Sequence, residues 1–191
     1  MKVFAIVNNY APSEGIADRG WYLIADSAVS NTGKPFYLPE FVGPTVVSLT
    51  IAVRFSRLGK YIDRKFASKY FSEFAPALHF HLPEYGYNLR SQGLPEDASR
   101  SFDKSLIIDE FIPKDQFENV ELRKNGESAA RFSLENLHDD LEELIAKVSV
   151  MNTVKMGDLL LPALSGNIEI REGDLLEVFH GSQKAFHVRI K

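Results

Sequence analysis

Most of this chain consists of short apolar and β-branched runs separated by turn-forming residues, and this limits the folds that it can adopt. The runs that favour strands are 3–7, 21–25, 46–55, 74–82, 105–111, 120–123, 128–132, 168–170, 175–179 and 185–190. Only two segments, 58–71 and 133–150, carry apolar residues at helical spacing. Because strands and helices do not alternate regularly, the pattern predicts an α+β fold with a mixed β-sheet roll or sandwich and two main helices.

Three local signals refine this expectation. Asn125-Gly126 lies between two strand-like runs and predicts a hairpin, since a type I′ turn needs positive φ at both central residues. Ser133 is the expected N-cap of the second helix. Residues 85–99 contain Gly, Asn, Ser and Pro, which predicts a long loop with one helical turn.

Length and charge bound the class of protein. A chain of 191 residues is expected to form one domain, 1–191, and to bury roughly 70% of its unfolded surface. The net charge of −4 gives no electrostatic reason to bind nucleic acid or an acidic membrane. The absence of cysteine excludes disulfides and thiolate ligands. The first apolar run is too short for a signal peptide and no run is long enough to span a membrane, so a cytoplasmic location is expected.

The densest group of titratable residues surrounds His79-Phe80-His81. Residues two apart on a strand share a face, so both imidazoles are expected to point the same way. Together with Glu84, Asp103 or His180 they could complete a transition-metal site. With Glu84 or Asp103 they could instead form a general acid–base pair, or they could be two structural histidines.

Arg100 lies between this run and Asp103. Its guanidinium could bind a carboxylate ligand through two hydrogen bonds. The alternative, which the sequence favours, is an ion pair with a nearby acid such as Asp97 or Asp103.

Several short phrases occur in an order that carries a family resemblance. They are Asn9-Tyr10, Ser27-Ala28, Leu38-Pro39-Glu40, Ala52-Val53, Ser101-Phe102-Asp103, Asn125-Gly126-Glu127, Gly157-Asp158 and Glu172-Gly173-Asp174. Together they resemble the fumarylacetoacetate hydrolase family over nearly the whole chain. The resemblance implies a mixed β-roll, a homodimer, and Mg²⁺ or Mn²⁺ that polarises a dicarbonyl substrate. The implied chemistry is C–C hydrolysis, decarboxylation or keto–enol isomerisation of oxo-acids.

The resemblance also locates the family's metal ligands, a Glu-x-Glu pair and an Asp, at Ser48, Thr50 and His79. Two neutral hydroxyls cannot offset the desolvation of Mg²⁺, and an imidazole suits softer metals. Other family positions are also replaced: a Lys by Arg100, an Arg by Pro83, a second Lys by Ile24, a lid His by Ser13, and a Thr-Gly-Thr-Pro phrase by Leu160-Leu161-Pro162. No metal cofactor is therefore expected.

These departures favour a diverged family member without metal-dependent activity, which keeps the fold and binds a small oxo-acid-like molecule or a partner. In this hypothesis Ser48 and Thr50 are candidates for lining the pocket. The alternative is an active enzyme with a rebuilt site, for which His79, His81, Arg100 and Asp103 are the candidate catalytic residues. A third hypothesis sets the resemblance aside and predicts a small β-rich metal-binding domain.

Overall fold

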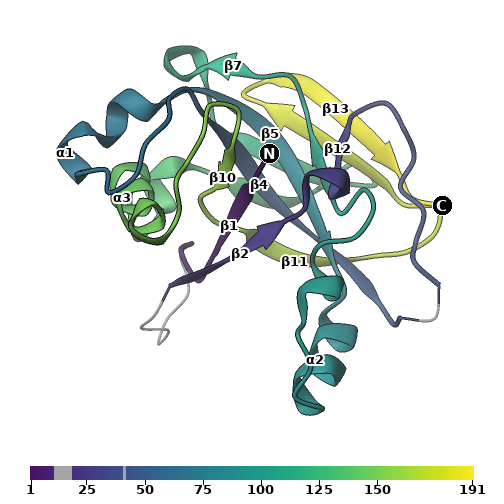
Figure 1. Cartoon of the computed structure of the whole chain (residues 1–191). Coiled ribbons are helices and arrows are strands. Elements are labelled where there is room, and N and C mark those ends of the chain that lie inside the picture. Colours follow the sequence, from purple (N-terminus) through teal and green to yellow (C-terminus); the bar gives the residue numbers. More distant parts are fainter. Residues whose placement is uncertain (11–18, 41) are drawn as a thin grey trace.

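The computed structural model describes residues 1–10, 19–40 and 42–191, in which two β-sheets form the body of the molecule (Figure 1). The larger sheet has the strand order β2-β1-β10-β4-β5-β6-β3, with β11 paired to β4 and β7 paired to β5. Its strands are β1 (Val3–Val7), β2 (Gly20–Ile24), β3 (Val29–Asn31), β4 (Thr45–Phe55), β5 (Phe71–His81), β6 (Leu106–Ile108), β7 (Ile112–Pro113), β10 (Leu159–Leu161) and β11 (Ser165–Ile170). The smaller sheet has the order β13-β12-β8-β9. Its strands are β8 (Val120–Lys124), β9 (Glu127–Phe132), β12 (Leu175–His180) and β13 (Gln183–Arg189).

Helices are few and lie outside the sheets. The α-helices are α1 (Arg64–Ala67), α2 (Pro83–Ser91) and α3 (Leu141–Met151). Five short 3₁₀ turns complete the described structure: Asp26–Ala28, Ser68–Tyr70, Asp97–Ser99, Lys114–Gln116 and Leu134–Asn136. The predicted α+β class with mixed sheets and few helices is confirmed. Of the two helices predicted over 58–71 and 133–150, the second contains α3, whereas the other long helix, α2, lies where a loop was predicted. Within the described residues no helix has the length and apolarity needed to cross a membrane.

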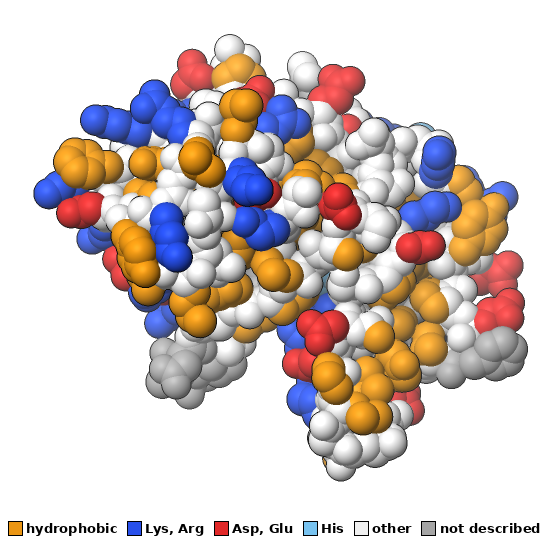
Figure 2. All heavy atoms as spheres, viewed as in Figure 1, with side chains coloured by type: hydrophobic (Ala, Val, Ile, Leu, Met, Phe, Trp, Pro, Cys, Tyr) orange, Lys and Arg blue, Asp and Glu red, His pale blue; other side chains and the backbone are white. Residues whose placement is uncertain are grey.

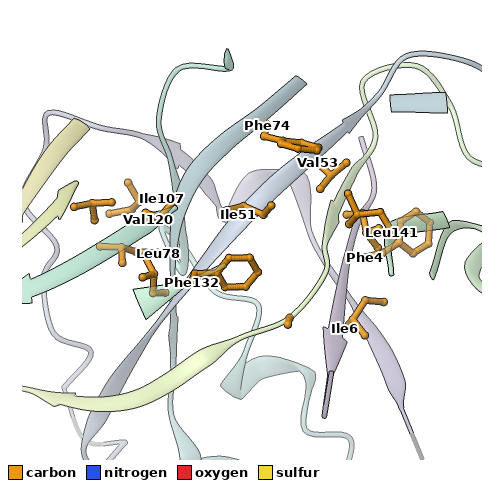
Figure 3. Packing of buried hydrophobic residues seen from close by; sticks show 14 of the residues in the cluster. Phe4, Ile6, Ile51, Val53, Phe74, Leu78, Ile107, Val120, Phe132 and Leu141 are labelled. Carbon is orange, nitrogen blue, oxygen red and sulfur yellow. The ribbon is translucent and has the colours of Figure 1, made fainter. Parts of the chain in front are cut away.

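The long strands β4 and β5 form the centre of the larger sheet. They pair antiparallel, whereas β1 pairs parallel with β10 and β3 pairs parallel with β6. Ten of the eleven residues of β4 are buried, because both faces of this strand are covered. Side chains from β1, β4, β5, β6, β8, β9 and α3 meet in the main core (Figure 3): Phe4, Ile6, Ile51, Val53, Phe74, Leu78, Ile107, Val120, Phe132 and Leu141.

The predicted helix over 58–71 was wrong in extent. Only Arg64–Ala67 is α-helical, and Phe71 already begins β5. Asp63 starts the helix by accepting a hydrogen bond from the Lys65 amide at 3.0 Å. The apolar residues that suggested one buried helical face do not form one, because the large side chains at 58, 61 and 66 are exposed.

The predicted start of the second helix was also wrong. Ser133 caps only the 3₁₀ turn, where its hydroxyl accepts from the Glu135 amide at 3.3 Å. The α-helix α3 begins after Asp140, whose carboxylate accepts from the Glu143 amide at 2.8 Å. A carboxylate at the N-cap also interacts favourably with the helix dipole, so Asp140 provides the stronger start.

The segment predicted over 85–99 as a loop with one helical turn is helical at both ends, in α2 and in the 3₁₀ turn Asp97–Ser99. Residues 83–91 form α2, which begins with Pro83 in its first turn, where the absent amide hydrogen costs nothing. The predicted hairpin is confirmed: β8 and β9 are joined through Asn125 at φ 54° and Gly126 at φ 87°.

Candidate functional site

Strand β5 carries the two histidines, and the neighbouring β4 fixes their surroundings. In the antiparallel register His79 lies opposite Ser48, and His81 lies opposite Val46. The two imidazole rings are nearly parallel, 14° apart, with their centroids separated by 5.6 Å. The prediction that both rings share one face of the strand is therefore confirmed.

His79 is completely buried, and both of its ring nitrogens have partners. Its Nε2 lies 2.9 Å from the carbonyl oxygen of Arg100, and its Nδ1 lies 3.4 Å from the hydroxyl of Tyr22. Because a carbonyl only accepts, Nε2 carries the hydrogen, and Nδ1 faces the hydroxyl as an acceptor. Burial, with His81 and the Arg100 charge adding to it, lowers the pKa of His79 to about 3. His79 is thus a neutral imidazole held in one tautomer.

Tyr22 of β2 connects this histidine to Arg100. Burial raises the pKa of the Tyr22 phenol to about 12, although the Arg100 charge acts in the opposite direction. The Arg100 guanidinium lies over the Tyr22 ring, 4.9 Å from its centroid. Tyr22 therefore stays protonated near neutral pH and can donate to His79.

Ser48 and Thr50 are fully buried, and their hydroxyls point to β11 and to the residues just before it. The Ser48 hydroxyl lies 2.6 Å from the carbonyl of Gly166, and the Thr50 hydroxyl lies 2.6 Å from that of Ala163. Since carbonyl oxygens only accept, both hydroxyls donate. These two hydrogen bonds link β4 to this segment. The structure does not bring either residue to the cavity at His81.

That cavity, of about 280 Å³, opens beside His81. It is lined by Val7, Asn8, Tyr22, His81, Leu82, Pro83, Gly86, Arg90, Glu96, Ser99, Arg100, Leu164 and Asn167. The Nδ1 atom of His81 is buried and has no hydrogen-bond partner among the described residues. Burial and the Arg100 charge lower the pKa of His81 to about 4, so its ring is neutral at pH 7. Buried polar atoms are normally paired, so this nitrogen is suited to a ligand or a water molecule.

Two arginines share one acid at the cavity wall. Arg90 of α2 contacts the Glu96 carboxylate, and Arg100 Nη2 lies 3.5 Å from the same oxygen. The predicted alternative for Arg100, an ion pair with a nearby acid, is thus confirmed, with Glu96 as the partner instead of Asp97 or Asp103. Two cations against one carboxylate leave an excess positive charge, which favours an anionic ligand.

The other candidates lie elsewhere. Asp103 is exposed in a turn and does not line the cavity, and Glu84 is exposed in the first turn of α2. His180, on the smaller sheet, accepts a hydrogen bond from the Glu118 amide at 2.6 Å. Ser13 lies outside the described residues. The structure thus brings together His79, His81 and Arg100 of the predicted set.

Sequence reasoning missed Tyr22, Asn8, Arg90, Glu96 and Asn167. They come from β2, the end of β1, α2 and β11 and from the loop after α2, and no spacing along the chain connects them. The one available signal was the acidic Glu96 between two arginines, since charges four residues apart can meet on one helical turn.

The residues at the family's metal positions do not fit a hard cation. In 1–10, 19–40 and 42–191 no group of three or more His, Asp or Glu side chains is placed to hold a metal ion. Ser48 and Thr50 donate their hydrogens to carbonyls, and both nitrogens of His79 are engaged. Mg²⁺ and Mn²⁺ prefer anionic oxygens, which this set lacks.

Known proteins share this fold and part of this sequence. No family model matches the chain. The mitochondrial oxaloacetate tautomerase FAHD1 of Rattus norvegicus is 22% identical over 162 residues, which cover 82% of this chain and 73% of that protein. The oxaloacetate tautomerase YcgM of Escherichia coli (strain K12) is 22% identical over 194 residues, which cover 93% of this chain and 87% of that protein.

The structural similarity extends over the whole chain. The crystal structure of fumarylpyruvate hydrolase from Pseudomonas aeruginosa in complex with Mn²⁺ and pyruvate has a TM-score of 0.90 at 18% identity, covering 100% of this chain and 89% of that one. Fold and sequence comparisons agree with the resemblance drawn from the short phrases, and the mixed β-roll type is confirmed. The chain therefore shares the fold of fumarylacetoacetate hydrolase-family proteins and is similar to them over most of its sequence.

Proposed function

We propose that this chain binds a small oxo-acid in the His81 cavity and lacks the divalent-cation-dependent activity of its family. The observation that carries the proposal is the contrast between two sets of residues. Those at the family's carboxylate positions, Ser48, Thr50 and His79, have their polar hydrogens engaged inside the protein: each faces a backbone carbonyl, and the Ser48 hydroxyl also lies 3.1 Å from Asn167 Oδ1. Beside them, the cavity keeps an unpartnered His81 nitrogen and an excess positive charge.

The size and charge of the cavity support this ligand class. About 280 Å³ suits a molecule of a few heavy atoms, just below the usual range for drug-sized ligands. Arg100 can pair with a carboxylate, and a neutral His81 can hydrogen-bond a keto or carboxylate oxygen. Pyruvate is bound in the structure of the fumarylpyruvate hydrolase that shares the fold, and oxaloacetate is in the name of the similar tautomerases.

Binding is tested by thermal shift and calorimetric titration of the full chain with pyruvate and with oxaloacetate. A ligand at one hundred times its Kd raises the free energy of unfolding by about 2.7 kcal/mol, so a shift is expected. Arg100→Gln should weaken binding roughly 10- to 100-fold, since hydrogen bonds to charged groups contribute more than neutral ones. Arg171→Gln is the matched control, because Arg171 forms a similar ion pair with Glu169 on the surface.

The absence of metal-dependent activity is tested with oxaloacetate keto–enol tautomerisation in Mg²⁺, in Mn²⁺ and in EDTA. We expect no rate above buffer in any of the three. A tautomerisation rate that Mg²⁺ stimulates and EDTA removes contradicts the proposal. A thermal shift with Mg²⁺ that persists in His79→Ala contradicts the conclusion that the residues at the family's metal positions do not suit a hard cation.

The alternative, an active enzyme with a rebuilt site, rests on His81. Its neutral ring and its unpartnered Nδ1 give a group that could accept a proton inside the cavity. In that case Arg100 would hold the substrate carboxylate, and His79 would be a positioning residue. A turnover that survives EDTA and disappears in His81→Ala would favour this alternative.

The family resemblance further predicts a homodimer, and we propose a cytoplasmic location. The oligomeric state is measured by size-exclusion chromatography with light scattering. A monomer at all concentrations would contradict the first prediction.

A further inference from the structure

One end of the molecule combines exposed apolar side chains with cations (Figure 2, at the left, where Figure 1 places α1). We define this basic–apolar surface as residues 57–69 and 150–156. Backbone hydrogen bonds hold the two segments side by side: Gly59 and Val154 form a bridge in both directions, and the Tyr61 amide donates to the Ser149 carbonyl at 3.0 Å. The surface is therefore a fixed feature of the fold.

Large apolar side chains are concentrated here. Six of the eleven that are exposed among the described residues belong to this surface: Leu58, Tyr61, Phe66, Val150, Met151 and Met156, between 48% and 77% exposed. Scattered single apolar residues are normal on a protein surface, whereas a cluster marks an interaction site.

Positive charge is concentrated at the same place. The surface holds six cations, Arg57, Lys60, Arg64, Lys65, Lys69 and Lys155, and one acid, Asp63. Arg64 and Lys65 form ion pairs, but Arg57, Lys60, Lys69 and Lys155 have no acidic partner among the described residues. Since the whole chain has a net charge of −4, this concentration is a local feature that the net charge conceals.

The backbone holds one aromatic residue of this surface in an unfavourable conformation. Tyr61 has φ 52°, in the left-handed region that disfavours residues other than glycine and asparagine, and its side chain is 70% exposed. The Ser149 hydroxyl accepts from the Ile62 amide at 2.9 Å and helps to fix this turn. Within the molecule the exposed Tyr61 ring has a cation–π contact with Lys60, whose Nζ lies 5.1 Å from the ring centroid. A strained backbone that presents an aromatic ring and a cation to solvent is a reason to look for an external partner.

We propose that the basic–apolar surface docks on a membrane that carries anionic lipids. Lysine and arginine are attracted to anionic headgroups, and apolar side chains between them can enter the interface without spanning the bilayer. A second copy of this chain fits less well, because a two-fold interface would place the same unpaired cations against each other. From the sequence we expect no membrane partner, because the net charge is negative. That argument assumes that the charges are spread evenly over the surface, whereas the cations are concentrated here.

The test is co-sedimentation of the full chain with vesicles of phosphatidylcholine alone and of phosphatidylcholine with about 30% phosphatidylserine. We expect binding to the second composition, weakened by added salt, and little binding to the first. No binding to phosphatidylserine vesicles, or equal binding to both compositions, overturns the proposal.

Three variants locate the contact. Lys60→Glu with Lys69→Glu should reduce the affinity for phosphatidylserine vesicles by at least about 30-fold. The matched control is Lys34→Glu with Lys191→Glu, which makes the same charge change near the opposite end, where Phe36 pairs with Ile190. Tyr61→Gly should reduce the affinity about fivefold while keeping or raising the melting temperature, because glycine suits the positive φ.

Equal affinities of the lysine variant and its control overturn the proposal. So does light scattering that shows a wild-type dimer which the lysine variant dissociates, because the surface would then be covered by a second copy. If the chain binds an acidic polyglutamate peptide but does not bind the vesicles, the proposal is overturned in favour of an acidic protein partner.

Discussion

The two histidines of β5 lie two residues apart on one face of the same strand, yet their environments differ. His79 is fully buried at the centre of the sheet, with a backbone carbonyl and a tyrosine hydroxyl at its nitrogens. His81 reaches the cavity and keeps one buried nitrogen without a partner among the described residues. Two successive positions on one face of the strand thus hold a fully hydrogen-bonded histidine and a histidine beside a cavity that has one unpartnered nitrogen.

The largest expected effect comes from replacing His79, the histidine with internal hydrogen-bond partners. His79→Ala removes a buried ring and leaves the Arg100 carbonyl and the Tyr22 hydroxyl without their partner. We expect the free energy of unfolding to fall by about 3 kcal/mol in urea titrations. The control is His187→Ala, because His187 is an exposed histidine on β13. Similar losses in both variants would contradict the structural role of His79.

The dependence of stability on pH should show the same contrast. Burial lowers the pKa of His79 to about 3, against about 6.5 in the unfolded chain. Below pH 6.5 the unfolded state binds a proton that the folded state does not, so stability is full above this pH and falls as the pH drops toward 3. Between pH 7 and pH 5 the free energy of unfolding of the wild-type protein should fall by about 2 kcal/mol more than that of the His79→Gln variant.

Unfolding measured at both pH values checks this expectation. His81, with its pKa lowered to about 4, should add a smaller loss in the same direction, because it is partly exposed. Parallel pH profiles for the wild type and His79→Gln would show that His79 does not titrate as described.

A smaller effect is expected on β4. Thr50→Val keeps the shape of the side chain but leaves the Ala163 carbonyl without its donor, at a cost of about 1 kcal/mol in unfolding. We expect ligand affinity to be unchanged, because Thr50 faces β11 rather than the cavity. Thr153→Val, at an exposed threonine, is the control. A large loss of ligand affinity would instead support Thr50 as a residue of the binding pocket, as the sequence suggested.

The smallest effect on stability is expected at His81, and it sharpens the comparison. His81→Phe replaces a ring that has an unpartnered nitrogen, so the free energy of unfolding should change by about 0.5 kcal/mol or less. The same variant should lose oxo-acid binding at least about 10-fold in calorimetric titration. His79→Phe should show the reverse pattern, with a large loss of stability.

Local patterns predicted the hairpin and most of the strands because those signals are short-ranged, but they missed the short strands β3, β7 and β10. Asn125 and Gly126 specify their turn because both residues tolerate the positive φ that it requires. The long apolar run of β4 indicates a strand that is covered on both faces, whichever elements cover it. The helices were harder, because an apolar residue at helical spacing does not reveal whether it will be buried. Tyr61 and Phe66 are exposed, and the helix that they suggested is four residues long.

The candidate site was predicted in part. The spacing of His79 and His81 fixed their common face, and the family resemblance directed attention to Ser48, Thr50 and Arg100. Which of these residues reach the cavity depends on β2, β11 and α2, which lie far away in the sequence. Burial and hydrogen-bond partners are properties of the packed chain, so no spacing rule could have separated His79 from His81.

The sequence by itself determined the resemblance to the fumarylacetoacetate hydrolase family, the mixed α+β class and the absence of carboxylates at the positions that the resemblance assigns to metal ligands, because these depend on residue identity and order. Only the tertiary structure decided that Ser48, Thr50 and His79 are committed to internal hydrogen bonds while His81 and Arg100 face a cavity. The physical reason is that a polar side chain is available for a ligand only when the fold brings no internal partner to it, and those partners come from distant strands.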